Sequence, residues 1–224
     1  MKPLLEIAVF NIESARTAMS AGADRLELCI DLAAGGLTPP ADMIRQVKVE
    51  SACPFFVMIR PKAGGFVYSD AEFSKMKEEL LMAKSSGADG FVFGILNEDG
   101  TVNESANKEL VALANPLPCT FHRAFDDITD KQTALEQLIS CGFERVLTSG
   151  GIGNAADYGY ELKQLVQQAG GRIIVMPGGG VRSNNLQQIK ALTCATEYHS
   201  AAIINGGTVA DAGAVKSMKE ILAG

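Results

Sequence analysis

Several charged side chains interrupt short apolar segments that a folded protein would bury. Glu6 interrupts LLEIAVF and Glu27 interrupts RLELCI, while Arg60 ends FFVMIR and His122 lies near the end of PCTFHR. Buried charge is costly unless it is compensated or used, so side chains of this kind mark candidate functional sites. Carboxylates and imidazoles transfer protons, and guanidinium groups bind anions.

The spacing of these residues places them on one face of each segment. In a strand, successive side chains alternate between two faces, so Leu5, Ile7 and Val9 share the face opposite Glu6. The chain's two histidines, His122 and His199, both fall near the carboxyl ends of such segments. We therefore predict a site with these catalytic residues: Glu6, Glu27, Arg60, His122, Thr148 and His199. A purely structural alternative is that Glu6, Glu27 and Arg60 form a buried ion network that fills the interior.

Glycine-rich segments follow several of these runs. PGGGVRSNN begins at Pro177 and NGGT begins at Asn205. In barrels, loops after the seventh and eighth strands often bind phosphate next to a helix N-terminus, although three glycines also suit a tight turn. The predicted substrate-binding residues are Arg123, Asp126, Ser149, Gly178, Gly179 and Gly180.

The elements that would position these residues alternate regularly. Eight β-rich runs, each followed by helical apolar spacing, indicate parallel strands with crossover helices. The predicted strands span residues 4–10, 25–30, 55–60, 90–96, 118–123, 145–150, 172–177 and 197–201. We predict an α/β protein with a (β/α)8 TIM-type barrel as a single domain over residues 1–224, with a doubly wound open sheet as the alternative.

Composition excludes several kinds of partner. The formal charge is −6 and the pI about 5.0, without a cluster of Lys and Arg, which argues against nucleic acid or an anionic membrane. The sequence has neither the apolar segment of a signal peptide nor a run long enough to span a membrane. The lack of both predicts a cytoplasmic location, and five cysteines without a CxxC pair predict reduced thiols.

A family resemblance rests on motifs spread along the chain. ADRLELC, GGLTP, MIRP, YSD, TFHRAFD, RVLTSG and MPGGG occur in this order over most of the sequence. Together they resemble the CutC copper-homeostasis family. The resemblance implies a cytoplasmic barrel, commonly a homo-oligomer, that is associated with copper handling. The sequence departs from the family after the eighth strand, where members usually carry a long polar insertion and this chain has a short segment.

Copper(I) prefers thiolate and thioether ligands and accepts imidazole, so the inward candidates are Cys29, Met58 and His122. Cys29, in the family-like LELC motif, is the predicted metal ligand, with a small interior filler as its structural alternative. The other cysteines precede strands or face helices. Any copper(I) site would then be weak, mixed-ligand or intersubunit, and no other cofactor is predicted.

Three functions follow from this reasoning. The first is a CutC-like role in copper homeostasis or copper binding. The second is a metal-independent isomerase, lyase or aldolase that acts on a small anionic or phosphorylated substrate, which Arg60 and Arg123 would hold while Glu27 or His122 transfers a proton. The third is a catalytically silent barrel that serves as an interaction protein.

Overall fold

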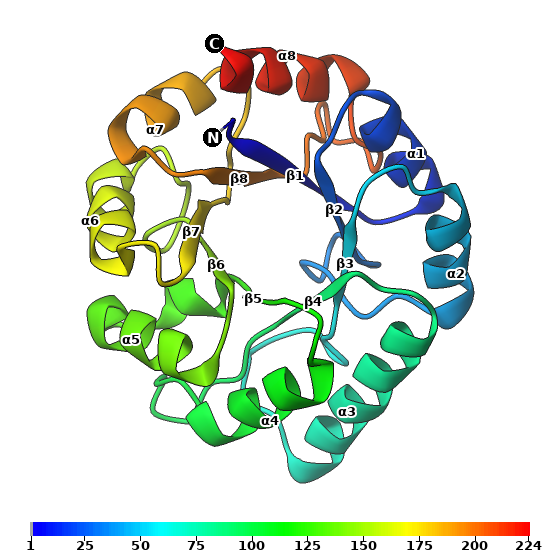
Figure 1. Ribbon diagram of the computed structural model, residues 1–224, viewed down its shortest axis with the longest axis vertical. Helices are drawn as coiled ribbons and strands as arrows, with labels where there is room; N and C mark the ends of the chain where they lie inside the picture. Colours follow the sequence, from blue (N-terminus) through cyan, green and yellow to red (C-terminus); the bar gives the residue numbers. More distant parts are fainter. Residues whose placement is uncertain (1) are drawn as a thin grey trace.

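Eight parallel strands form an inner ring, and helices surround it (Figure 1). The computed structural model describes residues 2–224. The strands are β1 (Leu4–Val9), β2 (Arg25–Leu28), β3 (Phe55–Met58), β4 (Gly90–Phe93), β5 (Cys119–Phe121), β6 (Arg145–Thr148), β7 (Ile174–Pro177) and β8 (Glu197–Ser200). This arrangement confirms the predicted (β/α)8 barrel, and each predicted strand is present, most of them shorter at the carboxyl end than expected.

The helices follow the strands in strict alternation. They are α1 (Ile12–Ser20), α2 (Ala41–Glu50), α3 (Asp70–Ser85), α4 (Glu104–Ala114), the 3-10 helix η1 (Arg123–Asp127), α5 (Lys131–Cys141), α6 (Gly159–Ala169), α7 (Leu186–Thr193) and α8 (Ala212–Ala223). Gly142 and Gly170 end α5 and α6 with positive φ, a backbone conformation that glycine adopts without a steric penalty. No helix within residues 2–224 is both long and apolar enough to cross a bilayer.

Hydrogen-bonded ladders join the strands in the order β7-β6-β5-β4-β3-β2-β1-β8. β1 pairs with both β2 and β8, so the first and last strands of the chain are neighbours. β7 and β8 lie beside each other in Figure 1, yet they are the two ends of this order, and no ladder joins them in the described chain. The barrel is therefore nearly closed, with one seam.

Two layers of side chains fill the structure. The larger core lies between sheet and helices and includes Leu5, Ile7 and Val9, as the alternation predicts. Inside the ring is a small apolar cluster of Cys29, Phe56, Met58 and Val92 with Phe10 packed against it. The rest of the interior is strongly polar.

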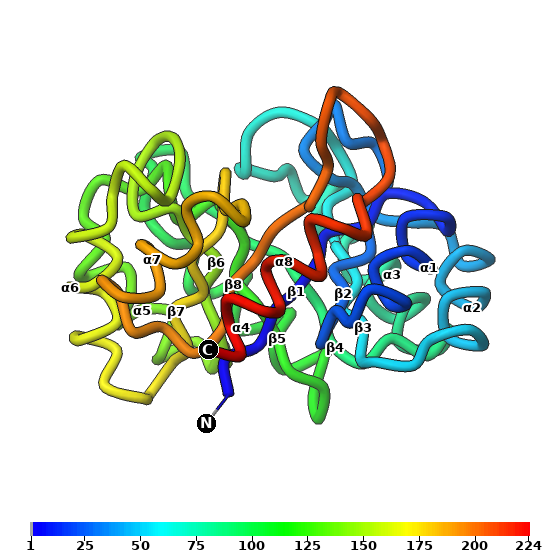
Figure 2. The backbone as a smooth tube through the Cα atoms, turned by 90° about the horizontal axis from the view of Figure 1, so that it is seen from above, coloured from blue at the N-terminus to red at the C-terminus, as the bar shows by residue number. Residues whose placement is uncertain are grey.

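The loops that follow the strands gather on one side of the ring. Figure 2 shows the segments after β2, β3 and β8 projecting on the side opposite the N-terminus. These loops bring residues far apart in the sequence over the carboxyl ends of the strands. This is the face where barrel enzymes carry their sites.

Candidate functional site

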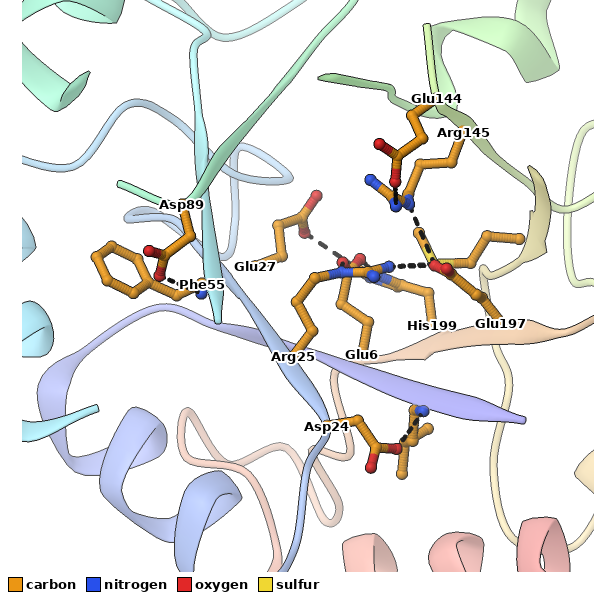
Figure 3. Close-up of polar contacts among 12 residues, drawn as sticks. Glu6, Asp24, Arg25, Glu27, Phe55, Asp89, Glu144, Arg145, Glu197 and His199 are labelled. Carbon is orange, nitrogen blue, oxygen red and sulfur yellow. Dashed lines mark hydrogen bonds and ion pairs between the residues drawn. The ribbon is translucent and has the colours of Figure 1, made fainter. Parts of the chain in front are cut away.

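A network of buried charged side chains crosses the barrel interior (Figure 3). The guanidinium of Arg25 donates hydrogen bonds to the carboxylates of Glu6 and Glu197. Arg145 reaches the same Glu197 carboxylate through its Nε at 3.1 Å. Two carboxylates and two guanidinium groups therefore balance in charge where water is excluded.

The ring of Phe56 lies next to both guanidinium groups. Its centroid is 4.9 Å from the Cζ atoms of Arg25 and of Arg145. Cation–π attraction compensates part of the lost hydration of each arginine. Gly90 makes this ring position possible, because a Cβ at that residue would lie 2.6 Å from the ring.

His199 connects this network to a third carboxylate. Its Nδ1 is 2.8 Å from Glu6 Oε1, and its Nε2 is 3.7 Å from Glu27 Oε2. Burial would raise the pKa of Glu6, but Arg25 and His199 outweigh it and lower that pKa to about 2. Burial lowers the pKa of His199, but Glu27 and Glu6 reverse the effect and raise it. Glu6 is therefore a fixed anion that orients the imidazole.

Glu27 is the carboxyl group of this cluster that titrates near neutrality. Burial raises its pKa to about 7, against the opposing charge of His199. Its Oε2 lies 3.7 Å from the thiol of Cys29, while its Oε1 has no hydrogen-bond partner among the described residues. A carboxyl group with this pKa and an unused oxygen is suited to giving and taking protons.

A cavity of about 210 Å³ opens above Glu27 and His199 at the carboxyl ends of the strands. Among the predicted site residues, it is lined by Glu27, Arg60, His122, Arg123, Gly179, Gly180 and His199. Glu6, Cys29, Asp126, Thr148, Ser149 and Gly178 are outside this lining. The alternation of inward side chains thus brings most of the predicted residues together.

Arg60 does not belong to the charge network. Its Nη1 donates to the carbonyls of Ala34 and Gly36 at 2.7 and 3.1 Å, and its Nη2 donates to Gly64 at 2.7 Å. The alternative in which Arg60 neutralises Glu6 and Glu27 is therefore wrong. Arg60 lies beyond the end of β3, so the loops after β2 and β3 hold its guanidinium.

His122 is a neutral imidazole with a defined tautomer. The backbone N–H of Ala124 donates to its Nδ1 at 3.2 Å, so the ring proton is on Nε2, which has no partner in residues 2–224. Burial and the charge of Arg60 lower the pKa of His122 to about 3. The ring packs 4.7 Å from that of Phe66, and Gly94 leaves room for it. His122 is therefore a hydrogen-bond donor in the cavity wall at neutral pH.

Asp126 organises the edge of the cavity. Its carboxylate accepts hydrogen bonds from the Thr148 hydroxyl at 2.5 Å, the Ser149 backbone at 3.0 Å and Arg123 Nε at 2.8 Å. Thr148 points away from the interior because Arg145 and Leu147 occupy the inward positions of β6. Asp126, Thr148 and Ser149 consequently position Arg123, which lines the cavity.

The glycine loop after β7 forms another side of the cavity. Gly179 and Gly180 have φ of +85° and +73°, and a Cβ at Gly179 would lie 2.9 Å from the Cζ of Arg123. Arg182 follows in the same loop, lines the cavity, and donates to the Ser200 hydroxyl at 3.2 Å. Arg182 was not among the predicted site residues, although it lies in the PGGGVRSNN segment that the sequence singles out.

Three further residues of the interior were not predicted from the sequence: Arg25, Arg145 and Glu197. Each lies two positions before an inward residue of the same strand, namely Glu27, Leu147 and His199. The alternation that identified Glu27 and His199 therefore also marks these three. They lie deeper than the cavity, at the amino ends of their strands.

The donor atoms in the interior fall into two groups with different metal preferences. Glu6, Glu27 and His199 each offer a ligand atom within 4.8 Å of the others, a hard set that suits divalent cations. The guanidinium of Arg25 is already ion-paired with Glu6, and its positive charge opposes the binding of a cation there. The soft donors are Cys29 and Met58: a Cβ at Gly36 would lie 3.3 Å from the thiol sulfur and 3.7 Å from the Met58 methyl. Copper(I) fits this second pair better.

A nearly closed eight-stranded barrel with titratable groups and arginines at its carboxyl face defines a protein of the TIM-barrel class. Distant barrels share this fold, including phosphoribosyl anthranilate isomerase from Thermotoga maritima, at 13% identity with a TM-score of 0.65 over 99% of this chain and 98% of the other. At that identity the likeness concerns the fold alone.

The chain belongs to the CutC family, whose model matches residues 3–204. The copper homeostasis protein cutC homolog of Homo sapiens is 49% identical over 89% of this chain and 73% of its own length. The family protein CutC of Histophilus somni is 46% identical, over 88% and 82%. The CutC crystal structure from Streptococcus agalactiae has a TM-score of 0.84 at 34% identity, over 89% and 98%.

Proposed function

We propose that this chain takes part in copper homeostasis, the role that the names of its mammalian relatives state, and that it binds copper(I) at Cys29. The observation that supports this site is that Cys29 and Met58 belong to one cluster inside the ring, and that the Cys29 sulfur and the Met58 methyl both lie within 3.7 Å of the position a Cβ at Gly36 would take. These are the two side-chain types that copper(I) prefers. The remaining four cysteines lie outside this cluster.

The surroundings of Cys29 set the expected behaviour of such a site. Burial and the neighbouring Glu27 raise the pKa of the Cys29 thiol well above its usual value. Copper(I) must therefore displace a proton from sulfur, and binding should strengthen as the pH rises. One thiolate with one thioether gives a mixed-ligand site of modest affinity.

Competition with a chromogenic copper(I) chelator under anaerobic, reducing conditions tests this proposal. Cys29→Ser should weaken copper(I) binding about tenfold or more, since it removes the single thiolate. The matched control is Cys194→Ser, because Cys194 is exposed and lies outside the interior cluster of Cys29 and Met58. Equal affinities for the two variants would remove the copper site from Cys29.

A second candidate is acid–base catalysis on a small substrate. It is favoured by Glu27, whose Oε1 has no partner in the described chain and whose Oε2 lies 3.7 Å from His199 Nε2. Glu27 would accept a proton from carbon next to a carbonyl group. The resulting enolate oxygen would accept a hydrogen bond from His122 Nε2, and Glu27 would return the proton. In D2O this cycle replaces C–H by C–D.

Proton NMR of a panel of 2-oxo and 3-oxo acids in D2O measures this exchange directly. We expect enzyme-dependent loss of a C–H signal that Glu27→Gln abolishes and that Glu136→Gln, a change in an exposed ion pair, preserves. Exchange at the buffer rate for every compound would exclude the candidate.

A cytoplasmic, single-domain homo-oligomer remains our expectation for the cellular form, and free cysteines support the compartment.

A further inference from the structure

The cavity contains more positive charge than the described residues neutralise. Arg123 is paired with Asp126 at 2.8 Å. Arg60 and Arg182 also line the cavity, and neither has a carboxylate within 4.0 Å in residues 2–224. Their partners are backbone carbonyls and the Ser200 hydroxyl, which carry no net charge.

Three residues that line this cavity carry buried polar atoms without a hydrogen-bond partner in the described chain. Of the buried side-chain atoms without a partner, Arg60 Nε, His122 Nε2 and Glu27 Oε1 all belong to residues that line this cavity. Arg60 is only 6% exposed and His122 and Glu27 are 4% exposed. Buried polar atoms are rarely left unpaired, so three at one cavity indicate a polar ligand.

We infer that this cavity binds a small oxyanion, a carboxylate or a phosphate, with its anionic oxygens against Arg60 and Arg182 and another polar group against His122 and Glu27. Charge complementarity selects an anion of one or two charges. The volume of about 210 Å³, below the roughly 300–1,000 Å³ of drug-sized pockets, selects a small molecule. This ligand class would be the substrate class of the second candidate function. The inference rests on that function only in placing the ligand in the same cavity, and Cys29 takes no part in it.

Calorimetry at pH 7 with malonate and inorganic phosphate as probes tests the inference, and malonamide is the uncharged match for malonate. Binding of either anion supports the site and identifies which oxyanion it prefers. Arg182→Gln should weaken that binding about tenfold or more, as expected for a lost charge-assisted hydrogen bond. Arg172→Gln, which alters an exposed arginine paired with Glu136, should leave it within about twofold.

The inference is overturned if neither anion binds, if malonamide binds as well as malonate, or if the two arginine variants behave alike. Anion binding without deuterium exchange would retain this inference and remove the catalytic candidate. Deuterium exchange of substrate that is unaffected by Arg182→Gln would retain the catalytic candidate and remove this inference.

Discussion

Arg25 provides the sharpest test of how the barrel interior is stabilised. Arg25→Met removes the guanidinium that bridges Glu6 and Glu197, but keeps most of the apolar volume. Breaking a buried ion pair by removing one partner costs about 3–5 kcal/mol, because the other charge stays buried. We expect a loss of that size in the free energy of unfolding at pH 7.5, measured by urea denaturation with circular dichroism.

The same variant should respond differently to acid. The folded pKa of Glu6 is about 2, below its ordinary 4.5, so Glu6 contributes stability above pH 4.5 that is lost as the pH falls toward 2. Without Arg25 most of this contribution disappears. The gap between wild type and Arg25→Met should therefore shrink by about 1 kcal/mol between pH 4.5 and pH 3.5.

Two further variants make the outcome decisive. Arg172→Met, which breaks an exposed ion pair, should cost no more than about 1 kcal/mol. Adding Glu6→Gln to Arg25→Met should recover part of the loss, because one unpaired carboxylate is removed. A cost for Arg25→Met equal to that of Arg172→Met, or a cost independent of pH, would refute the reasoning.

Three other changes probe the site. His122→Asn should make stability less sensitive to acid. The pKa of His122 is about 3 in the folded protein and 6.5 when unfolded, so the wild type should lose about 2 kcal/mol of unfolding free energy between pH 6.5 and pH 5. Urea denaturation measures this loss, and an equal loss in wild type and variant would contradict the prediction. Gly90→Ala should cost about 1–3 kcal/mol by overpacking against Phe56, whereas Gly65→Ala, with open space, should leave the Tm nearly unchanged. Asp126→Asn should lower stability by about 1–3 kcal/mol in thermal denaturation, and an unchanged Tm would count against its organising role.

Alternation of side chains carried most of the sequence prediction. Because the strand period is two, a charged residue in an apolar run identifies the inward face without knowledge of the fold. Glu6, Glu27 and His199 were assigned to the interior in this way, and the structure brings His199 within hydrogen-bonding or ion-pair range of both carboxylates. The repeated strand–helix rhythm likewise predicted the barrel.

Pairing inside the barrel could not be read from the sequence, because it depends on register and on side-chain reach. Glu6 lies opposite Arg25 in the ladder between β1 and β2, and this register is a three-dimensional property. Arg60 has the same charge and also faces inward, but it lies past the last residue of β3. Carbonyl groups of the loops accept its hydrogen bonds there. Which arginine pairs with Glu6 therefore depends on where the strands end, and the sequence indicates those ends only to within a few residues.

The seam between β7 and β8 has a consequence for motion. Backbone groups along these two strands face each other without the ladder that ties every other pair of neighbours in the described chain. Opening there breaks fewer hydrogen bonds than opening elsewhere, so amides at this edge should exchange with solvent sooner. Because His199 is on β8 and the glycine loop follows β7, this more readily opened edge adjoins the cavity, and its opening should be slowed when a ligand occupies the cavity.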